Sequence, residues 1–367
     1  MPFKKYFFGL KNFDWLLFGS VLLLICFGLA AIYSIAISSD KPDFVNFNKQ
    51  VTFAILGLFI LFFLSFLNYR LWQDFSYLAY TFTAILLVAV VFFGKTIRGT
   101  TGWFSVLGFN FQPVELAKVA LIMFLAWFLS QKGESIKELK NFFIAGGIAG
   151  FYCLLVLMQP DFGSAVILFL IWLLMMIFAQ ADKKHLVALF ILLILAGVMA
   201  WFFFLQPYQK DRILTFLSPQ ADPYGRGYHV RQAMTAVGAG GLLGQGLGFG
   251  SQSQLKFLPA SQTDFIFAVI AEELGFFGVG LVFFFWSIIL YRLVKAAKSV
   301  KDSFALFFIL GVSAMFFCQI IINIGMNIGI VPVTGISLPF LSYGGSFLVS
   351  SLALIGIVES MITKNQN

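Results

Sequence analysis

The sequence is poor in charged residues, histidines and cysteines. Asp, Glu, Lys and Arg make up 11% of its 367 residues, compared with about 25% in ordinary soluble domains. The two histidines, His185 and His229, lie far apart without neighbouring cysteines, so no zinc-type ligand cluster is expected. Each of the three cysteines lies inside an apolar run, which predicts packing residues and excludes a disulfide framework.

Hydrophobic residues, by contrast, make up 60% of the chain, against roughly 45–50% in soluble domains. Apolar runs long enough to cross a bilayer recur along the whole length. We therefore predict an all-α, polytopic integral membrane protein with a single transmembrane domain over residues 1–367. About ten spans are expected, near residues 14–37, 48–67, 75–94, 114–131, 142–158, 162–180, 185–205, 264–291, 304–328 and 345–362.

The positive charge of the chain predicts its orientation in the membrane. A net charge of +8 could indicate nucleic-acid binding, but no basic stripe with interleaved aromatic residues is present, so we expect no nucleic-acid partner. Most of the 24 Lys and Arg residues fall on the cytoplasmic side if the N-terminus is placed there. The positive-inside rule then predicts a multi-pass protein with both termini in the cytoplasm.

Three segments on the outer face, residues 95–112, 206–263 and 324–345, are too polar or too rich in glycine to be simple connections. The large extracytoplasmic loop at 206–263, between the seventh and eighth spans, is expected to line or cover a site. It contains GAGGLLGQGLGFG from Gly238 to Gly250. No strand precedes this run and no GK[ST] follows, so its glycines predict tight turns and not a nucleotide site.

Asp264 marks the junction between this loop and the eighth span. A carboxylate in the first turn of a membrane helix is predicted to lie at the water–lipid boundary, where it can face a lipid-borne substrate. A purely structural role, as a helix-start residue favoured by the free N–H groups, remains open. Glu272 and Glu273 follow on the same helix, but Glu272 would lie about 12 Å away along the axis. Glycosidase carboxylate pairs lie roughly 5–9.5 Å apart, so Asp264 would act as a single base.

Other polar residues also interrupt the apolar runs. Glu115 and Lys118 have i, i+3 spacing, which predicts a mutual ion pair. That pair is either structural or presents Lys118 to an anionic lipid head group. Asp161 follows a turn between two spans and is predicted to cap the next helix. In the ninth span, amide side chains recur at i, i+4 and i+8, which predicts interhelical hydrogen bonds; they are Gln319, Asn323 and Asn327.

Several motifs are spread along the chain. They are FDWLLF at Phe13, FQPVELAK from Phe111 to Lys118, MQPDFGSA from Met158, RILTFLSPQADPYGRGY from Arg212 to Tyr228, TDFIFAVIAEELGFFG from Thr263, and NIGMNIGIVPVTGISLPFLSYGGS from Asn323 to Ser346. Together they resemble the SEDS glycosyltransferases of bacterial cell-wall synthesis, the family of RodA and FtsW. The resemblance covers nearly the whole chain, and GSQSQLKFLP from Gly250 is more similar to the RodA branch, which acts in cell elongation.

The resemblance implies a peptidoglycan glycosyltransferase of the bacterial cell (inner) membrane. Members of the family polymerise lipid II, with undecaprenyl diphosphate as the leaving group. Asp264 matches the essential aspartate, and a weakly nucleophilic sugar hydroxyl needs such a base. Cations should neutralise the diphosphate, and no metal ligands are predicted, although a Mg or Mn ion could bridge it. The candidate substrate-binding residues are Lys118, oriented by Glu115, together with Arg98, Arg212, Arg231, Gln112 and Ser342.

The sequence departs from the family pattern at a few positions. Ala260 and Gln262 stand where Glu and His are usual, and Gly102 replaces an arginine beside Trp103. The usual QPSE and GIPLPF motifs are QPVE and GISLPF here, and Asn68 stands where an acid is common. None of these changes removes Asp264 or Lys118, so the resemblance still implies activity.

The resemblance also implies a protein partner, a class B penicillin-binding transpeptidase with a single membrane helix, in contact with the eighth and ninth spans. Two alternative functions remain open. Intramembrane charges are also typical of transporters, which would make the protein a lipid II flippase. If the departures have removed catalysis, the protein would be a scaffold for other wall enzymes.

Overall fold

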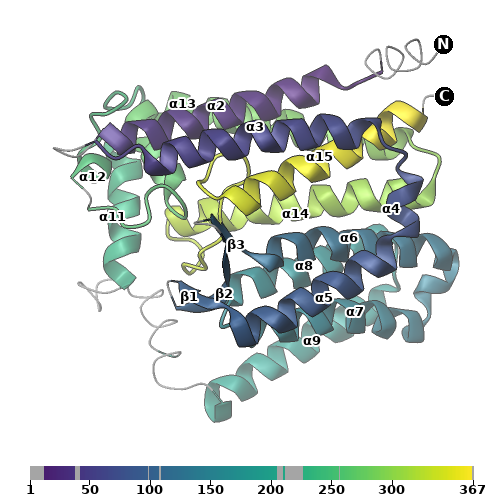
Figure 1. Ribbon diagram of the computed structural model, residues 1–367. Coiled ribbons are helices and arrows are strands. Elements are labelled where there is room, and N and C mark those ends of the chain that lie inside the picture. Colours follow the sequence, from purple (N-terminus) through teal and green to yellow (C-terminus); the bar gives the residue numbers. More distant parts are fainter. Residues whose placement is uncertain are drawn as a thin grey trace, which may run out of the picture.

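The structure is a computed structural model that describes residues 12–37, 42–97, 99–106, 109–204, 210, 226–255 and 257–365. Long helices run side by side, and a small sheet and short helices lie toward one end of the bundle (Figure 1). Ten helices of the described part match the ten predicted spans: α2 (Trp15–Ile37), α3 (Val45–Phe66), α5 (Ser76–Phe93), α6 (Pro113–Lys132), α7 (Leu139–Leu157), α8 (Phe162–Phe178), α9 (Lys183–Met199), α13 (Ile266–Ser299), α14 (Ser303–Asn327) and α15 (Gly345–Asn365).

These helices confirm the prediction of a polytopic membrane protein. Within the described ranges, nine of them are long and apolar enough to cross a bilayer, and α8 is a shorter apolar helix. The starts of α6 and α14 follow the expected capping chemistry. Pro113 begins α6, and the Asp302 carboxylate accepts a hydrogen bond from Ala305 N at 3.0 Å to begin α14. The first described helix begins and α15 ends on the same face (Figure 1).

The core is formed where α15 packs along α3, and where α6, α8 and α13 pack against α14. Gly356 allows the close approach of α15 and α3, because a Cβ there would lie 2.6 Å from the Leu61 carbonyl oxygen. Aromatic rings fill the space between α13, α14 and the segment at 328–344. The ring of Phe340 stacks on Trp286 at 5.5 Å and contacts Phe316 at 5.3 Å.

The face opposite the termini carries structure that the sequence did not predict. An antiparallel sheet in the order β1-β2-β3 is formed by β1 (Lys95–Ile97), β2 (Thr100–Val106) and β3 (Phe109–Phe111). The predicted loop before α13 contains α11 (Arg226–Ala239) and α12 (Ser251–Gln254). Three further short elements are α4 (Arg70–Asp74), the 3-10 helix η1 (Gly133–Lys137) and the π-helix η2 (Ala200–Phe204).

The predicted eighth span corresponds to α13, which breaks at Gly275. This residue has φ 64° and ψ −164°, which only glycine adopts readily. The glycine-rich loop replaces the missing helical hydrogen bonds on both sides of the break. Phe276 N donates to Gly241 O at 2.9 Å, and the Glu272 carbonyl accepts from Gln245 N at 2.9 Å. Residues 276–299 alone would extend about 36 Å, enough to cross a bilayer.

Candidate functional site

Asp264 lies in a turn that precedes α13, whose first residue is Ile266. The prediction that it occupies the first turn of the helix is therefore wrong by two residues. Asp264 is half-buried, and the turn closes on one carbonyl: Ala260 O accepts from Thr263 N at 3.0 Å and from Phe265 N at 3.3 Å. Ala260 has φ 50°, a left-handed conformation that is strained for a residue with a Cβ. Contacts outside the turn must therefore hold it.

Two amides of α14 provide one set of those contacts. The Nδ2 atoms of Asn323 and Asn327 both donate to the Asp264 carbonyl at 3.1 Å. Asn327 Oδ1 accepts from Ala268 N at 3.1 Å, and Asn323 Nδ2 also donates to Ile336 O at 2.7 Å. The predicted interhelical bonding of this polar stripe is thus confirmed for Asn327, which bonds to α13, while Asn323 bonds to the Asp264 turn and to Ile336 O, which lie outside the helices.

The segment between α14 and α15 provides a second set, through Ser342. Its hydroxyl donates to Thr263 O at 2.6 Å and accepts from Leu338 N at 2.8 Å. The next residue, Tyr343, donates from its backbone N to Gln262 O at 2.8 Å. The Ser342 hydroxyl therefore joins the Asp264 turn, through Thr263 O, to the backbone of its own segment, through Leu338 N. Its predicted contact with substrate stays a prediction.

Two polar residues at the start of α3, which the sequence did not single out, complete the turn's support. Gln50 Nε2 donates to Ser342 O, and its Oε1 accepts from Gly344 N, both at 3.1 Å. Asn46 Nδ2 donates to Gln262 Oε1 at 2.8 Å, so the residue that replaces the usual histidine has a defined partner. Their only signal in the sequence is that two amides lie four residues apart at the edge of an apolar run.

Glycines bring α8 close to the same turn. A Cβ on Gly335 would lie 3.8 Å from Asp264 Oδ2, and a Cβ on Gly163 would lie 2.4 Å from Thr334 O. Next to Gly163, Asp161 caps α8 by accepting from Ser164 N at 2.9 Å, as predicted. The structure thus places the start of α8, residues 334–335 and Asp264 in sequence across the face opposite the termini.

Gln112 lies at the start of α6 and belongs to this polar region. Its Nε2 donates to Asp161 Oδ2 at 3.2 Å. Beside it, a Cβ on Gly102 would lie 3.3 Å from Gln159 Oε1 and 3.9 Å from Gln112 Nε2. The sheet therefore packs against the Gln112–Asp161 contact, and a larger side chain at Gly102 would have to displace the two glutamines.

Glu115 and Lys118 form the predicted ion pair one turn into α6. Lys118 Nζ lies 2.8 Å from each carboxylate oxygen of Glu115. Lys118 is 4% exposed and Glu115 is 8% exposed, so the pair is almost enclosed. The ammonium group also lies 5.5 Å from the centre of the Phe347 ring, close to the start of α15. The geometry leaves both interpretations of this pair open, the structural one and the one involving an anionic head group.

Of the three predicted arginines, Arg231 lies within the described residues. Arg231 is half-buried on α11, which packs against the end of α14, where a Cβ on Gly329 would lie 2.8 Å from Met234 Sδ. Arg98 and Arg212 lie outside the described residues.

Glu272 and Glu273 do not pair with Asp264. Both are buried, and Glu272 accepts from Gln252 N at 2.7 Å and from Ser253 N at 3.0 Å at the start of α12. Glu273 accepts from Gln254 Nε2 at 3.2 Å and from the hydroxyl of Ser34 on α2. The two carboxylates therefore anchor α12, directly after the glycine-rich loop, and the role of Asp264 as a single base stays a prediction.

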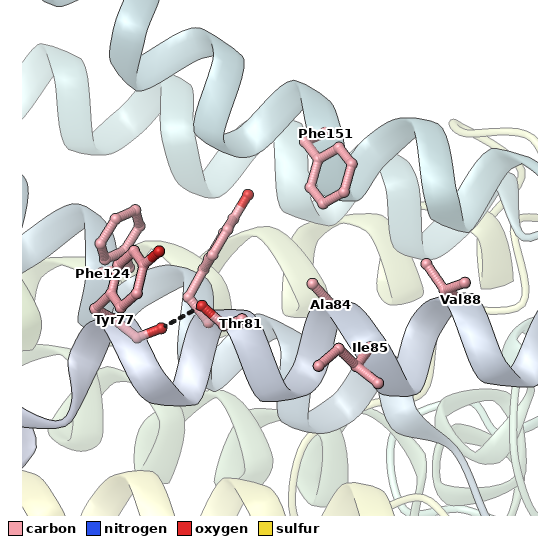
Figure 2. A pocket seen from close by; sticks show the side chains of 8 residues that line it. Tyr77, Thr81, Ala84, Ile85, Val88, Phe124 and Phe151 are labelled. Carbon is pink, nitrogen blue, oxygen red and sulfur yellow. Dashed lines mark hydrogen bonds between the residues drawn. The ribbon is translucent and has the colours of Figure 1, made fainter.

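In the described part of the chain, neither a cluster of metal ligands nor the apolar cavity of Figure 2 coincides with the predicted site residues. Within the described ranges no three His, Cys, Asp or Glu side chains gather as metal ligands would. A Mg or Mn ion that bridges the diphosphate stays a prediction. An apolar cavity of about 420 Å³ opens between α5, α6 and α7 (Figure 2). Its lining includes Tyr77, Ile85, Phe124 and Phe151 and none of the predicted site residues.

Comparison with known proteins identifies the family. The family model described as "Cell cycle protein" (FtsW/RodA/SpoVE) matches residues 14–367. The chain is 38% identical to stage V sporulation protein E of Bacillus subtilis (strain 168), over 94% of this chain and 95% of that one. It is 34% identical to peptidoglycan glycosyltransferase MrdB of Escherichia coli (strain K12), over 99% and 96% of the two chains.

A solved structure supports the same assignment. The structure is that of a peptidoglycan synthase complex, solved to explain the coordination of polymerization and crosslinking. One of its chains superposes on this protein with a TM-score of 0.84. The identity is 30%, and the match covers 96% of this chain and 98% of the other. The chain therefore belongs to the FtsW/RodA/SpoVE family, as its motifs predicted.

Proposed function

We propose that this protein is a peptidoglycan glycosyltransferase that polymerises lipid II, with Asp264 as its general base. The proposal depends most on one observation: a half-buried carboxylate lies in a turn whose backbone accepts hydrogen bonds from α14 and from the 328–344 segment, while α3 donates to the Gln262 side chain of the same turn. A fixed carboxylate of this kind suits proton abstraction from a weak nucleophile. Relatives such as the Escherichia coli protein are named peptidoglycan glycosyltransferases, which supports the reaction class.

In the proposed reaction, Asp264 accepts the proton of a sugar hydroxyl on the acceptor lipid II. The hydroxyl oxygen forms a bond to the anomeric carbon of the growing glycan. The bond from that carbon to the diphosphate breaks, and the electron pair leaves with undecaprenyl diphosphate. Attack opposite the leaving group inverts the anomeric carbon.

The leaving diphosphate needs cationic groups near it. Lys118 is the first candidate, with Glu115 holding its ammonium group in place, and Arg231, Arg98 and Arg212 are the others. Gln112 and Ser342 are proposed to complete the substrate site. No step requires a protein-bound metal, and a Mg or Mn ion would be held mainly by the diphosphate itself.

We further propose that the termini face the cytoplasm of a bacterium, so that Asp264 lies toward the outer surface of the inner membrane. The excess of Lys and Arg on the face of the termini supports this orientation. We assign the protein to the elongation branch on the segment from Gly250 to Pro259. Relatives of the sporulation type also match. The branch is tested by deleting the gene and asking whether cell shape is lost and is restored when the gene is returned.

A class B penicillin-binding transpeptidase is the proposed partner. The neighbour of known structure belongs to a complex that couples polymerization to crosslinking. On this chain, α13 and α14 expose several large aromatic side chains that a single membrane helix could cover. They are Phe276, Phe277, Phe284 and Phe317, exposed by 71%, 67%, 57% and 49%.

Polymerisation of labelled lipid II by purified protein tests the proposed function. The wild-type protein should produce long glycan chains, and the partner should increase the yield; assays with and without divalent ions measure the metal dependence. Asp264→Asn should abolish the product while the protein remains folded. Asp74→Asn, which changes an exposed carboxylate in α4 on the opposite face, is the control and should leave the product unchanged.

The same preparation separates the alternative functions. Polymer from Asp264→Asn at the wild-type rate would overturn the assignment of the base. Movement of lipid II across vesicles by a protein that forms no polymer would indicate a flippase. Tight binding of the transpeptidase without polymer or lipid movement would indicate a scaffold.

A further inference from the structure

A side chain of α14 lies between the Asp264 turn and the first turn of α13. In a regular helix, Ala268 N–H would donate to the carbonyl of Asp264, four residues earlier. Here Ala268 N donates to Asn327 Oδ1 at 3.1 Å, and Asn327 Nδ2 donates to Asp264 O at 3.1 Å. The amide of one α14 residue therefore lies between two backbone groups that would otherwise bond to each other.

We propose that Asn327 is a positioning residue, which sets the place of the Asp264 carboxylate by keeping the Asp264 turn from joining the first turn of α13. This inference rests on the proposed function of Asp264. Because the amide separates Ala268 N from Asp264 O, it keeps Asp264 out of the helix, in the turn beside Gly335. If Ala268 N bonded directly to Asp264 O, the backbone of Asp264 would move toward Ala268 and carry its carboxylate away from that position.

Neighbouring hydrogen bonds hold the Asn327 amide and the Asp264 carbonyl in this arrangement. Asn323 Nδ2 donates to the same carbonyl and also to Ile336 O at 2.7 Å, so the Asp264 turn is tied to the segment that carries Gly335. Asn327 Nδ2 additionally donates to Asn323 O at 2.8 Å. Asn327 and Asn323 are both 0% exposed, so no water competes for these bonds and the amide orientation is fixed by its partners.

The inserted amide has an unusual energetic consequence. Removing one partner of a buried hydrogen bond normally leaves the other group unsatisfied, at a cost of about 1–3 kcal/mol. In Asn327→Leu, however, Ala268 N–H and the Asp264 carbonyl can bond to each other and restore the helical pattern. The variant should therefore stay folded while its active carboxylate is misplaced, and a displacement of about 1 Å can reduce a rate by roughly 100-fold.

Gln319 provides a matched control on the same helix. It lies two turns before Asn327, it is 0% exposed, and neither of its amide atoms has a hydrogen-bond partner among the described residues. Gln319→Leu removes a buried amide from the same face of α14 without touching the Asp264 turn. We expect it to leave polymerisation unchanged and the thermal midpoint equal or higher.

The experiment measures lipid II polymerisation and thermal unfolding for Asn327→Leu, Asn327→Asp, Gln319→Leu and Asp264→Asn in the full-length protein. We expect Asn327→Leu to lower kcat at least tenfold, with KM changed less than about twofold and a thermal midpoint near that of the wild type. Asn327→Asp keeps an acceptor for Ala268 N but loses both donors, so its kcat should also fall.

The outcomes distinguish this inference from the proposed function. Wild-type kcat in folded Asn327→Leu, with Asp264→Asn inactive, would overturn the positioning role and leave the base in place. Full activity in Asp264→Asn would overturn the proposed function itself. Equal loss in Asn327→Leu and Gln319→Leu would show that any buried amide of α14 matters for folding, which would also refute the inference.

Discussion

Replacing Lys118 by methionine separates the two interpretations of the ion pair in α6. The substitution removes the ammonium group that lies 2.8 Å from both carboxylate oxygens of Glu115. Because Glu115 is only 8% exposed, water cannot replace that partner. Breaking a buried pair by removing one member costs about 3–5 kcal/mol, so Lys118→Met alone should lower the thermal midpoint strongly and lose polymerisation.

The double variant Lys118→Met, Glu115→Gln then decides the role of the lysine. Replacing both charges by neutral side chains of similar size is often neutral or stabilising, so thermal stability should return to near the wild-type value. We expect polymerisation to remain at least about 100-fold reduced, because the leaving diphosphate has lost its cation. Stability is measured by thermal unfolding in nanodiscs, and activity with labelled lipid II. A stable double variant with wild-type kcat/KM would refute the substrate role, and a fully stable single variant would refute the electrostatic argument.

Three further substitutions test the architecture. Ala260→Gly should increase the free energy of unfolding by about 0.5–1 kcal/mol and so raise the thermal midpoint, because φ 50° suits glycine. A lower midpoint would show that the backbone of Ala260 is not strained. Gly163→Ala should lower both stability and polymerisation, because its Cβ would lie 2.4 Å from Thr334 O and overpacking costs about 1–3 kcal/mol; a wild-type rate would show that the loop shifts freely. Arg292→Met should destabilise the protein, because it removes the partner at 2.6 Å from the buried Asp14 carboxylate, without changing kcat per folded molecule; a lower kcat at unchanged stability would contradict this structural role.

The membrane-spanning helices were predictable from sequence, because each needs a long apolar run and little else. Predicted and observed limits agree closely for α2, α6 and α14. The sheet was not predictable in the same way, since its strands are only three to seven residues long and too short for a clear period. The break at Gly275 was missed for a different reason. A glycine inside an apolar run is common in membrane helices, and its backbone conformation depends on the loop that packs against it.

The candidate site was predictable where an ionisable residue interrupts an apolar segment or matches a family motif. Asp264 and Lys118 were found in that way, and the pairing of Lys118 with Glu115 followed from their spacing. Asn46 and Gln50 were missed, because amides at the edge of a span are common and their partners lie more than 200 positions later. The bonds from Asn327 could be expected, but not their target, since the target depends on how α14 meets the start of α13.

The interruption of α13 has a mechanical consequence. The helical bonds that would join the two halves of α13 are replaced at positions 276 and 277 by bonds from Phe276 N and Phe277 N to the glycine-rich loop. The longer half can therefore move as a separate rod that meets the shorter half, which follows Asp264, at a joint. A neighbouring helix that tilts this rod would bend the joint first, and residues 241–246, which bond to both halves, would transmit the force toward the Asp264 turn.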